Sequence, residues 1–149
     1  MKNIEIKKLS SGDLNQFIEL IRVFEDVFEM KNFQIPKSEY LQSLLNRDDF
    51  YVFVSIFEDR VIGGLTTYTL RQYYSEKTLV YIFDLAVLTK YQRQGIGKSL
   101  IQGINAYCKD LGVEEVFVQA DLVDDYALDF YRATGGLAED VVHFTYPLG

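Results

Sequence analysis

The segment from Gln92 to Ser99 holds the residues best suited to chemistry in this chain, in the order Gln-Arg-Gln-Gly-Ile-Gly-Lys-Ser. It joins an apolar run to a pattern typical of a helix. Glycines at a helix start let the backbone approach a ligand, and the unpaired N–H groups there bind anions. Arg93 and Lys98 add positive charge beside the glycines. The segment therefore predicts a phosphate-binding turn, the alternative being a tight turn without a ligand.

Two common nucleotide-binding patterns do not match this segment. A P-loop requires a glycine at the position that Gln92 occupies. The dinucleotide fingerprint requires its third glycine where this chain has Leu100. Nucleotide hydrolysis is therefore disfavoured.

One carboxylate lies in an unusual place. Asp84 interrupts the apolar run Leu79–Leu88, where burying a charge is costly unless it has a partner or faces a cleft. A structural hydrogen bond to a neighbouring loop would also explain it. Further acidic residues follow the next expected strand and could line the same cleft or cap a helix; they are Asp121, Asp124, Asp125, Glu139 and Asp140.

Charge is unevenly distributed along the chain. Residues 1–109 have a balance of +1, whereas residues 110–149 have a balance of −8, within a net charge of −7. Such a chain repels phosphate backbones, so nucleic acid is an improbable partner. Its acidic end would attract a cationic molecule, although acidity can also serve solubility alone.

Several classes are excluded by composition. The single Cys108 rules out an intrachain disulfide and a cysteine-rich zinc site, and the single His143 rules out a multi-histidine metal centre. We therefore expect no metal. The segment Met1–Leu9 lacks the apolar core of a secretory signal, and Leu79–Leu88 is too short to span a bilayer. We expect a cytoplasmic protein.

The hydrophobic patterns predict one α/β domain over residues 1–149, in the order β-α-α-β-β-β-α-β-α-β. A βαβ unit over Leu79–Ala120 predicts parallel neighbours in an otherwise mostly antiparallel mixed sheet. Glycines inside the second arm of a hairpin, Gly63 and Gly64, indicate a bulge or a close backbone approach. The remaining elements are expected at residues 4–7, 14–28, 38–45, 50–57, 95–111, 116–120, 126–133 and 141–146.

Two motifs resemble those of the GCN5-related N-acetyltransferase (GNAT) family. The first is Gln92, Gly95 and Gly97, which follow the strand Asp84–Val87 as the family signature does. The second pattern, Asn-x-x-Ala-x-x-Phe-Tyr-x-x-x-Gly-Phe, reads here Asp124, Ala127, Phe130, Tyr131, Gly135, with Asp124 in place of Asn and Gly136 in place of the final Phe.

Within that family the chain is similar to the small aminoglycoside 3-N-acetyltransferases. The similarity lies in Tyr81–Val87, Arg93–Ile96, Val118–Asp121 with Asp124, Asp125 and Ala127, and Glu139–Phe144. It implies acetyl transfer from acetyl-CoA to a primary amine by direct transfer in a ternary complex. The expected acceptor is the 3-amino group of an aminoglycoside. The alternatives are another small amine, a polyamine, a protein N-terminus, or a module that binds CoA without catalysis.

The resemblance also implies roles for particular residues. The pyrophosphate would rest on backbone N–H groups of the glycine turn, and the pantetheine arm would pair with a strand that splays from its parallel neighbour. Tyr131 would donate a proton to the leaving thiolate, since a phenol of pKa about 10 is a fair acid for a thiol of about 8.5; simple packing is the alternative. Asp84 would accept the amine proton or bind the cation. The expected cofactor-binding residues are Leu85, Ala86, Val87, Gln92, Arg93, Gln94, Gly95, Ile96, Gly97, Lys98, Ser99, Asp124, Ala127 and Phe130.

The acidic end is expected to bind the acceptor. Asp121, Asp125, Glu139 and His143 are the predicted substrate-binding residues. His143 could instead be an ordinary residue of the last strand. The fold resembles families that often dimerise, so a homodimer is a possible assembly.

Overall fold

The computed structural model describes residues 3–149, which divide into two compact units, residues up to Gln119 and residues Ala120–Gly149. Each unit has its own architecture. That the whole chain forms a single domain stays a prediction.

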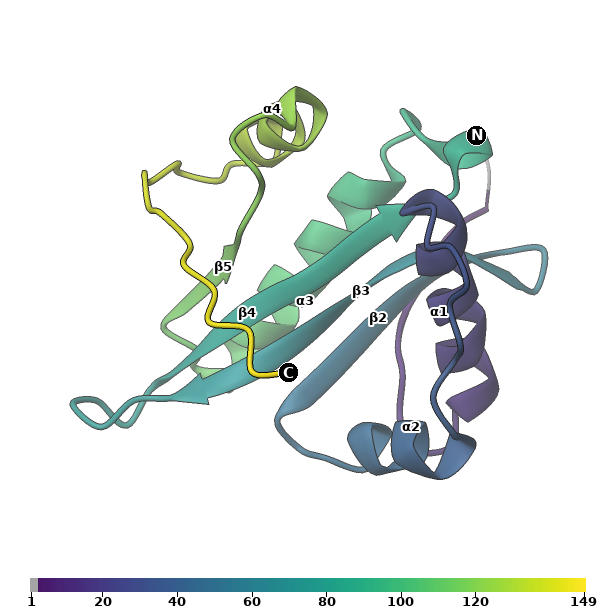
Figure 1. Cartoon of the computed structure of the whole chain (residues 1–149), viewed down its shortest axis with the longest axis horizontal. Coiled ribbons are helices and arrows are strands. Elements are labelled where there is room, and N and C mark those ends of the chain that lie inside the picture. Colours follow the sequence, from purple (N-terminus) through teal and green to yellow (C-terminus); the bar gives the residue numbers. More distant parts are fainter. Residues whose placement is uncertain (1–2) are drawn as a thin grey trace. The chain divides into compact units, whose positions relative to one another are not determined.

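A five-stranded sheet is the centre of the first unit, within its described residues 3–119 (Figure 1). The strands lie in the order β1-β2-β3-β4-β5. Neighbours are antiparallel as far as β4, and β4 pairs with β5 in parallel. The expected mixed, mostly antiparallel sheet with one parallel pair is confirmed. The strands are β1 (Glu5–Lys8), β2 (Phe50–Phe57), β3 (Arg60–Arg71), β4 (Thr78–Val87) and β5 (Glu115–Val118).

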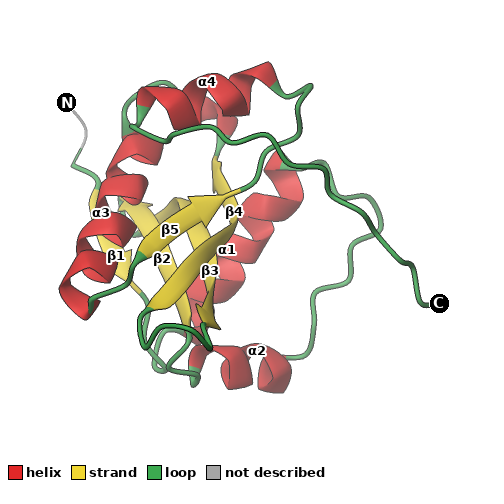
Figure 2. Ribbon diagram, turned by 90° about the vertical axis from the view of Figure 1, so that its left-hand side faces the viewer, coloured by secondary structure: helices red, strands yellow, loops and turns green. Residues whose placement is uncertain are grey.

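Helices cover both faces of this sheet (Figure 2). α1 (Leu14–Val27) and α2 (Ser38–Leu45) precede the long hairpin, and α3 (Ile96–Leu111) connects β4 to β5 through the short 3₁₀ helix η1 (Thr89–Tyr91). The α1 and α3 helices occupy opposite faces of the sheet. Their contacts show this, because successive residues of a strand point to opposite faces and the two helices lie at successive positions of the β2–β3 ladder. Leu20 of α1 lies at Gly64, which pairs with Val54, whereas Gly103 of α3 lies at the adjacent Phe53.

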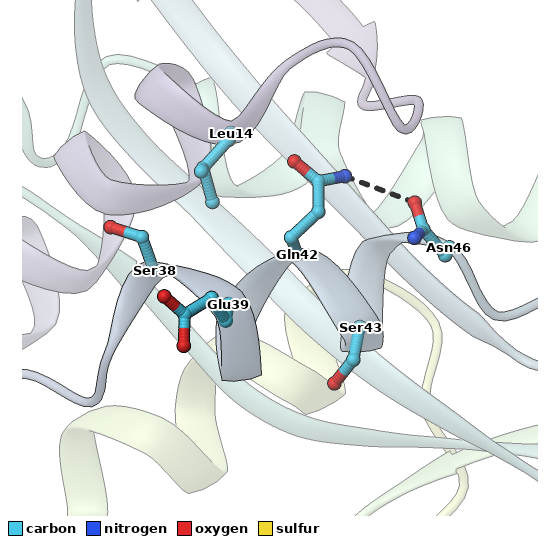
Figure 3. Close-up of a pocket in the computed structure, with 6 residues that line it drawn as sticks. All are labelled: Leu14, Ser38, Glu39, Gln42, Ser43 and Asn46. Carbon is cyan, nitrogen blue, oxygen red and sulfur yellow. Dashed lines mark hydrogen bonds between the residues drawn. The ribbon is translucent and has the colours of Figure 1, made fainter.

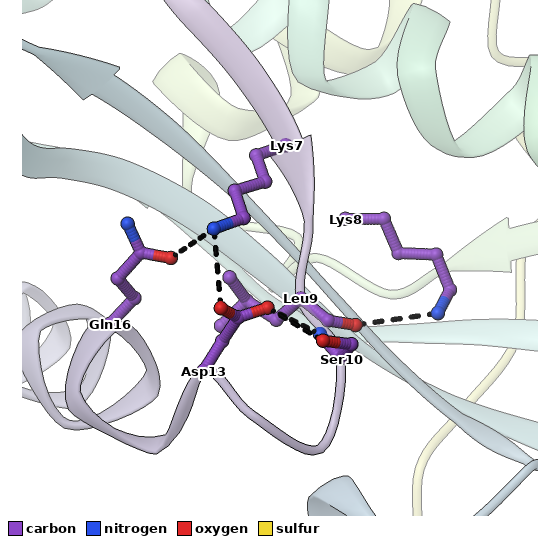
Figure 4. A network of polar contacts seen from close by, with 6 residues as sticks. All are labelled: Lys7, Lys8, Leu9, Ser10, Asp13 and Gln16. Carbon is purple, nitrogen blue, oxygen red and sulfur yellow. Dashed lines mark hydrogen bonds and ion pairs between the residues drawn. The ribbon is translucent and has the colours of Figure 1, made fainter.

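A polar network fixes the start of α1 (Figure 4). The Asp13 carboxylate accepts hydrogen bonds from the Ser10 backbone N–H at 2.7 Å and the Ser10 hydroxyl at 3.0 Å. Lys7 of β1 donates to the same carboxylate at 3.2 Å and to Gln16 at 2.8 Å. These contacts, the Ser10 backbone hydrogen bond foremost, lower the pKa of Asp13. The network ties the first strand to the first helix.

The two glycines of β3 permit close packing, as the sequence predicts. A Cβ at Gly64 would lie 2.5 Å from the Phe53 carbonyl oxygen and 2.6 Å from Leu20 Cδ1. A Cβ at Gly63 would lie 2.8 Å from the Ala86 carbonyl oxygen. Ile62 is also left unpaired between the two strands, because Ser55 pairs with Gly63 and Ile56 with Val61. Both the bulge and the close approach are therefore present.

The second unit contains one helix, α4 (Asp125–Ala133), within residues 120–149. The strand predicted at residues 141–146 is wrong for this structure, because residues 137–149 have no regular secondary structure and are exposed. Its β-branched and aromatic residues favour a strand, but a strand also needs a partner for its backbone groups. None of the described residues of the second unit forms one. Sequence preference alone is therefore insufficient here.

Substitution of Gly64 by alanine should destabilise the first unit. The added Cβ would overlap a backbone carbonyl that cannot rotate away, so we expect the free energy of unfolding to fall by about 1–3 kcal/mol in urea titration. Gly12→Ala is the matched control, since a Cβ there meets nothing within 4 Å. Equal stability of the two variants would contradict the close approach.

Candidate functional site

Asp84 of β4 directly follows a β-bulge in that strand. Thr66 of β3 pairs with Asp84, but the next residue, Thr67, pairs with Ile82, so Phe83 is the extra residue. Such a bulge bends a strand and re-aims its side chains, and bulges are frequent beside active sites. The sequence indicates an unusual carboxylate here but gives no sign of the bulge.

The Asp84 carboxylate is half-buried and has no partner. No residue of the described part of the first unit donates a hydrogen bond to it or forms an ion pair with it. Burial therefore raises its pKa. The structural hydrogen bond to a neighbouring loop, the alternative explanation for this residue, is absent from that unit. An unpaired carboxylate in this state is suited to bind a cation or accept a proton.

The strands β4 and β5 part immediately before Asp84. Their parallel ladder runs from Leu79 opposite Glu115 to Ile82 opposite Val118 and then stops, whereas β4 continues to Val87. Among the described residues 3–119, no strand pairs with Phe83–Val87 on the side away from β3. β5 ends at Val118, two residues earlier than predicted, and its ladder with β4 stops directly before the bulge at Phe83. An extended ligand could pair with this open edge as an additional strand does.

The glycine turn follows directly from β4 and η1. Gly95 is the N-cap of α3 and has a left-handed φ of +81°, which favours glycine. Arg93 also has a positive φ, of +61°. The first hydrogen bond of the helix runs from the Ser99 N–H to the Gly95 carbonyl at 3.0 Å. The N–H groups of Ile96, Gly97 and Lys98 therefore have no acceptor inside the helix.

Side chains at both ends of the turn hold its shape. The Gln92 side-chain amide donates to the Val87 carbonyl at 2.9 Å, which ties the turn to the end of β4. The Ser99 hydroxyl donates to the Gly95 carbonyl at 3.1 Å. Both groups of Ser99 are thus engaged within the turn, which leaves phosphate contacts mainly to its neighbours. Arg93, Gln94, Gly95 and Lys98 are exposed.

These features fit two adjoining parts of a CoA-type ligand, its pyrophosphate and its pantetheine arm. The N–H groups of the α3 start, with Arg93 and Lys98 alongside, suit a pyrophosphate. The open backbone edge at Leu85, Ala86 and Val87 suits an amide-containing arm. The structure thus brings these predicted residues together with Asp84 at one end of β4.

The second unit holds the remaining predicted residues. Asp124 is the N-cap of α4, and its carboxylate accepts a hydrogen bond from the Ala127 N–H at 3.1 Å. Aspartate therefore fills the position of the family asparagine with an equally effective cap. Phe130 and Tyr131 are half-buried on α4, with ring centroids 5.1 Å apart. Their roles toward Asp84 stay predictions.

The acidic residues proposed for the acceptor are exposed. Asp121 and Asp125 flank the start of α4, and Glu139 lies in the irregular segment that follows it. His143 is exposed there as well, so its alternative role as a residue of a sheet is wrong. These side chains are accessible to a ligand.

Three aromatic residues, Tyr40, Tyr68 and Phe83, are not predicted from the sequence as residues of the site. Tyr68 of β3 and Phe83 of β4 have ring centroids 5.5 Å apart. Tyr40 of α2 and Asp84 both raise the pKa of Tyr68, after the larger effect of burial. The alternation of β3 could have indicated that Tyr68 shares a face with Thr66, the partner of Asp84.

An open depression lies elsewhere, between the start of α1 and α2 (Figure 3). Gln42, at its centre, donates to Asn46 at 3.0 Å and to the Ser11 carbonyl at 2.7 Å, which ties α2 to the turn before α1. None of the predicted site residues lines it; it is lined by Leu14, Ser38, Glu39, Gln42, Ser43 and Asn46. We therefore regard it as structural.

The described residues 3–149 contain neither a candidate metal-binding cluster nor a candidate membrane-spanning helix. No three histidine, cysteine or acidic residues are grouped as ligands for a metal ion. No helix has both the length and the apolar character needed to cross a membrane.

Comparison with known proteins identifies the family. Residues 16–135 match the model of the acetyltransferase (GNAT) family. A crystal structure of the aminoglycoside acetyltransferase meta-AAC0020, from an uncultured soil metagenomic sample, is 61% identical, with a TM-score of 0.96 over 98% of this chain and 97% of that one. A second soil metagenomic aminoglycoside acetyltransferase, HMB0005, is 28% identical, with a TM-score of 0.93 over 99% of each chain.

A curated relative has an N-alpha-acetyltransferase name. N-alpha-acetyltransferase 30 of Schizosaccharomyces pombe is 27% identical over 108 residues, which is 70% of each chain. The glycine turn, the open edge of β4 and the matched family model all agree. The chain belongs to the GNAT family of acetyltransferases, and acetyl-CoA is its acetyl donor.

Proposed function

We propose that this enzyme is an aminoglycoside N-acetyltransferase that acts on the 3-amino group by direct transfer in a ternary complex. The observation that carries the proposal is the 61% identity, across nearly the whole of both chains, to meta-AAC0020. That protein was also crystallised in complex with sisomicin. The unpaired Asp84 beside the open strand edge supports a cationic acceptor in the same place.

Asp84 is the proposed base or cation anchor. The attacking amine must be neutral, and a carboxylate of raised pKa is a better proton acceptor than an ordinary one. Acetyl-CoA supplies an activated acetyl group on a thiol leaving group. Backbone N–H groups along Leu85–Val87 would orient the donor and stabilise the charge that develops on the acetyl oxygen.

Residues of the second unit complete the proposal. Tyr131 would protonate the departing thiolate, and Phe130 and Ala127 would contact the donor. Asp121, Asp125, Glu139 and His143 would bind further ammonium or hydroxyl groups of the acceptor, since several carboxylates attract a polycation. A cytoplasmic location and a homodimer belong to the same proposal.

The test is an acceptor screen on the purified chain, with thiol release as the readout. We expect turnover with gentamicin-type aminoglycosides at a kcat/KM well above that for spermidine or for peptides with free N-termini. NMR of the product should show acetylation at the 3-amino group. Preferential turnover of a peptide would instead favour the N-terminal acetyltransferase alternative, and no thiol release with any amine would favour a CoA-binding module.

Substitution of Asp84 by asparagine should remove proton acceptance without removing bulk. We expect kcat/KM for the aminoglycoside to fall by roughly 10²–10⁴, with little change in the KM for acetyl-CoA. Glu76→Gln, at an exposed position of the β3–β4 hairpin, is the control. A full-activity Asp84→Asn enzyme would exclude both roles proposed for this side chain.

The same variant should be more stable than the wild type at neutral pH. Burial raises the folded-state pKa of Asp84 above its unfolded value, so the folded protein binds this proton more readily. Its contribution to stability is therefore fully present below the unfolded pKa and is lost as pH rises through the folded pKa. Asparagine removes this dependence, so thermal denaturation should give a higher Tm for Asp84→Asn at pH 7 and a difference that shrinks in acid. A lower Tm at pH 7 would show that the carboxylate is structural.

Removal of the Tyr131 hydroxyl tests the proposed acid. Tyr131→Phe keeps the ring that contacts Phe130, so we expect a kcat reduced by roughly 10²-fold or more with a nearly unchanged KM for acetyl-CoA. Tyr126→Phe, an exposed tyrosine on the same helix, is the control. Equal kcat values in the two variants would leave protonation of the thiolate to solvent.

A further inference from the structure

Aromatic rings form a continuous row across four strands of the sheet. Tyr68 lies 5.2 Å from Phe50 and 5.5 Å from Phe83, measured between ring centroids. Phe83 lies 5.9 Å from Tyr81, which in turn stacks on Phe117 at 4.9 Å. The row thus spans β2, β3, β4 and β5.

Asp84 adjoins the centre of this row. Its cross-strand partner is Thr66, and Tyr68 is the next residue of β3 on that face, in the diagonal position from which long side chains reach one another. At the bulge, Phe83 and Asp84 are two successive residues of β4 that oppose a single residue of β3, so that an aromatic ring lies beside the carboxylate. Tyr40 of α2 and Asp84 are the titratable groups that act on Tyr68.

The middle of the row is accessible, although aromatic rings are usually buried. Tyr68 is 40% exposed and Phe83 54%, and outside the row Tyr40 of α2 is 57% exposed. At the end of the row Phe50 is buried, and its contact with Tyr68 fixes the orientation of that ring. A fixed, exposed ring beside one unpaired carboxylate complements a ligand that has a flat apolar ring face and a positive charge.

We propose that Tyr68 and Phe83 bind a ring of the acceptor by its C–H face and position the ammonium group of that ring at Asp84, with Tyr40 at the rim. The inference rests on the proposed function and extends it, because it names the residues that select a cyclic amine over a linear one. Tyr68 acts as a positioning residue, since the proton is taken by Asp84.

The matched variants are Tyr68→Phe, Tyr68→Leu and the control Tyr74→Leu. Tyr68→Phe keeps the ring, and Tyr68→Leu keeps apolar bulk without a ring. Tyr74 lies at the end of the same β3–β4 hairpin, is 72% exposed and contacts Tyr73. For each variant, KM and kcat are measured with a gentamicin-type aminoglycoside, with spermidine and with acetyl-CoA as the varied substrate. The Tm from thermal denaturation shows whether the variant is folded.

We expect Tyr68→Leu to raise the KM for the aminoglycoside about tenfold, a loss typical of a removed aromatic contact. Its KM for acetyl-CoA should stay within about twofold of the wild-type value. The ratio of kcat/KM for the aminoglycoside to kcat/KM for spermidine should fall. Tyr68→Phe and Tyr74→Leu should retain wild-type KM values for the aminoglycoside.

Two outcomes would overturn the inference. An unchanged aminoglycoside KM in Tyr68→Leu would show that the ring only packs, whatever the change in Tm. An equal increase in Tyr68→Phe would assign the effect to the hydroxyl rather than the ring. Failure of the proposed function is separate, because it would already be seen as wild-type enzyme that does not acetylate aminoglycosides.

Discussion

The separation of two parallel strands is the constraint on which the rest of this enzyme depends. The β4–β5 ladder ends at Ile82 and Val118, and the bulge at Phe83 follows at once. From that point β4 has backbone groups available to a ligand, an unpaired carboxylate on its surface, and a glycine turn at its end. If β5 paired with β4 as far as Val87, the strand edge would be closed. A donor held at the glycine turn could then not place its pantetheine arm along β4. Helices cover both faces of the sheet and Leu20 of α1 packs closely at Gly64 of β3, while one edge of β4 stays open.

The cost of this arrangement is concentrated at Asp84. A half-buried carboxylate without a hydrogen bond opposes folding, and stable proteins normally pair such a group. Retention of an unfavourable group at a strand bulge is typical of a functional site, where stability is given up for reactivity. By contrast, the Asp13 carboxylate has Ser10 and Lys7 as partners and a lowered pKa, and it links β1 to the start of α1.

Most of the secondary structure could be predicted from the sequence, because its patterns are locally strong. The α1 and α3 helices have clear apolar stripes, and Gly112 ends α3 in the left-handed conformation that favours glycine. The glycine turn could be predicted for the same reason, since its chemistry lies in successive residues. The bulge at Phe83 and the nearness of Tyr68 to Asp84 could not, because both depend on the register of β3 against β4. The strand predicted at residues 141–146 is wrong for the converse reason. Its residue types favour a strand, but its unit provides no partner strand for the backbone groups.

The proposed recognition of the donor by main-chain groups has a consequence for how such an enzyme can diversify. Backbone amides of β4 and α3 survive almost any change of side chain, so mutation there seldom alters which acyl carrier is accepted. The residues proposed to bind the acceptor act through their side chains, and the exposed ones among them can be replaced at little cost in folding free energy. New specificities for amines can therefore arise by single substitutions on an otherwise unaltered scaffold.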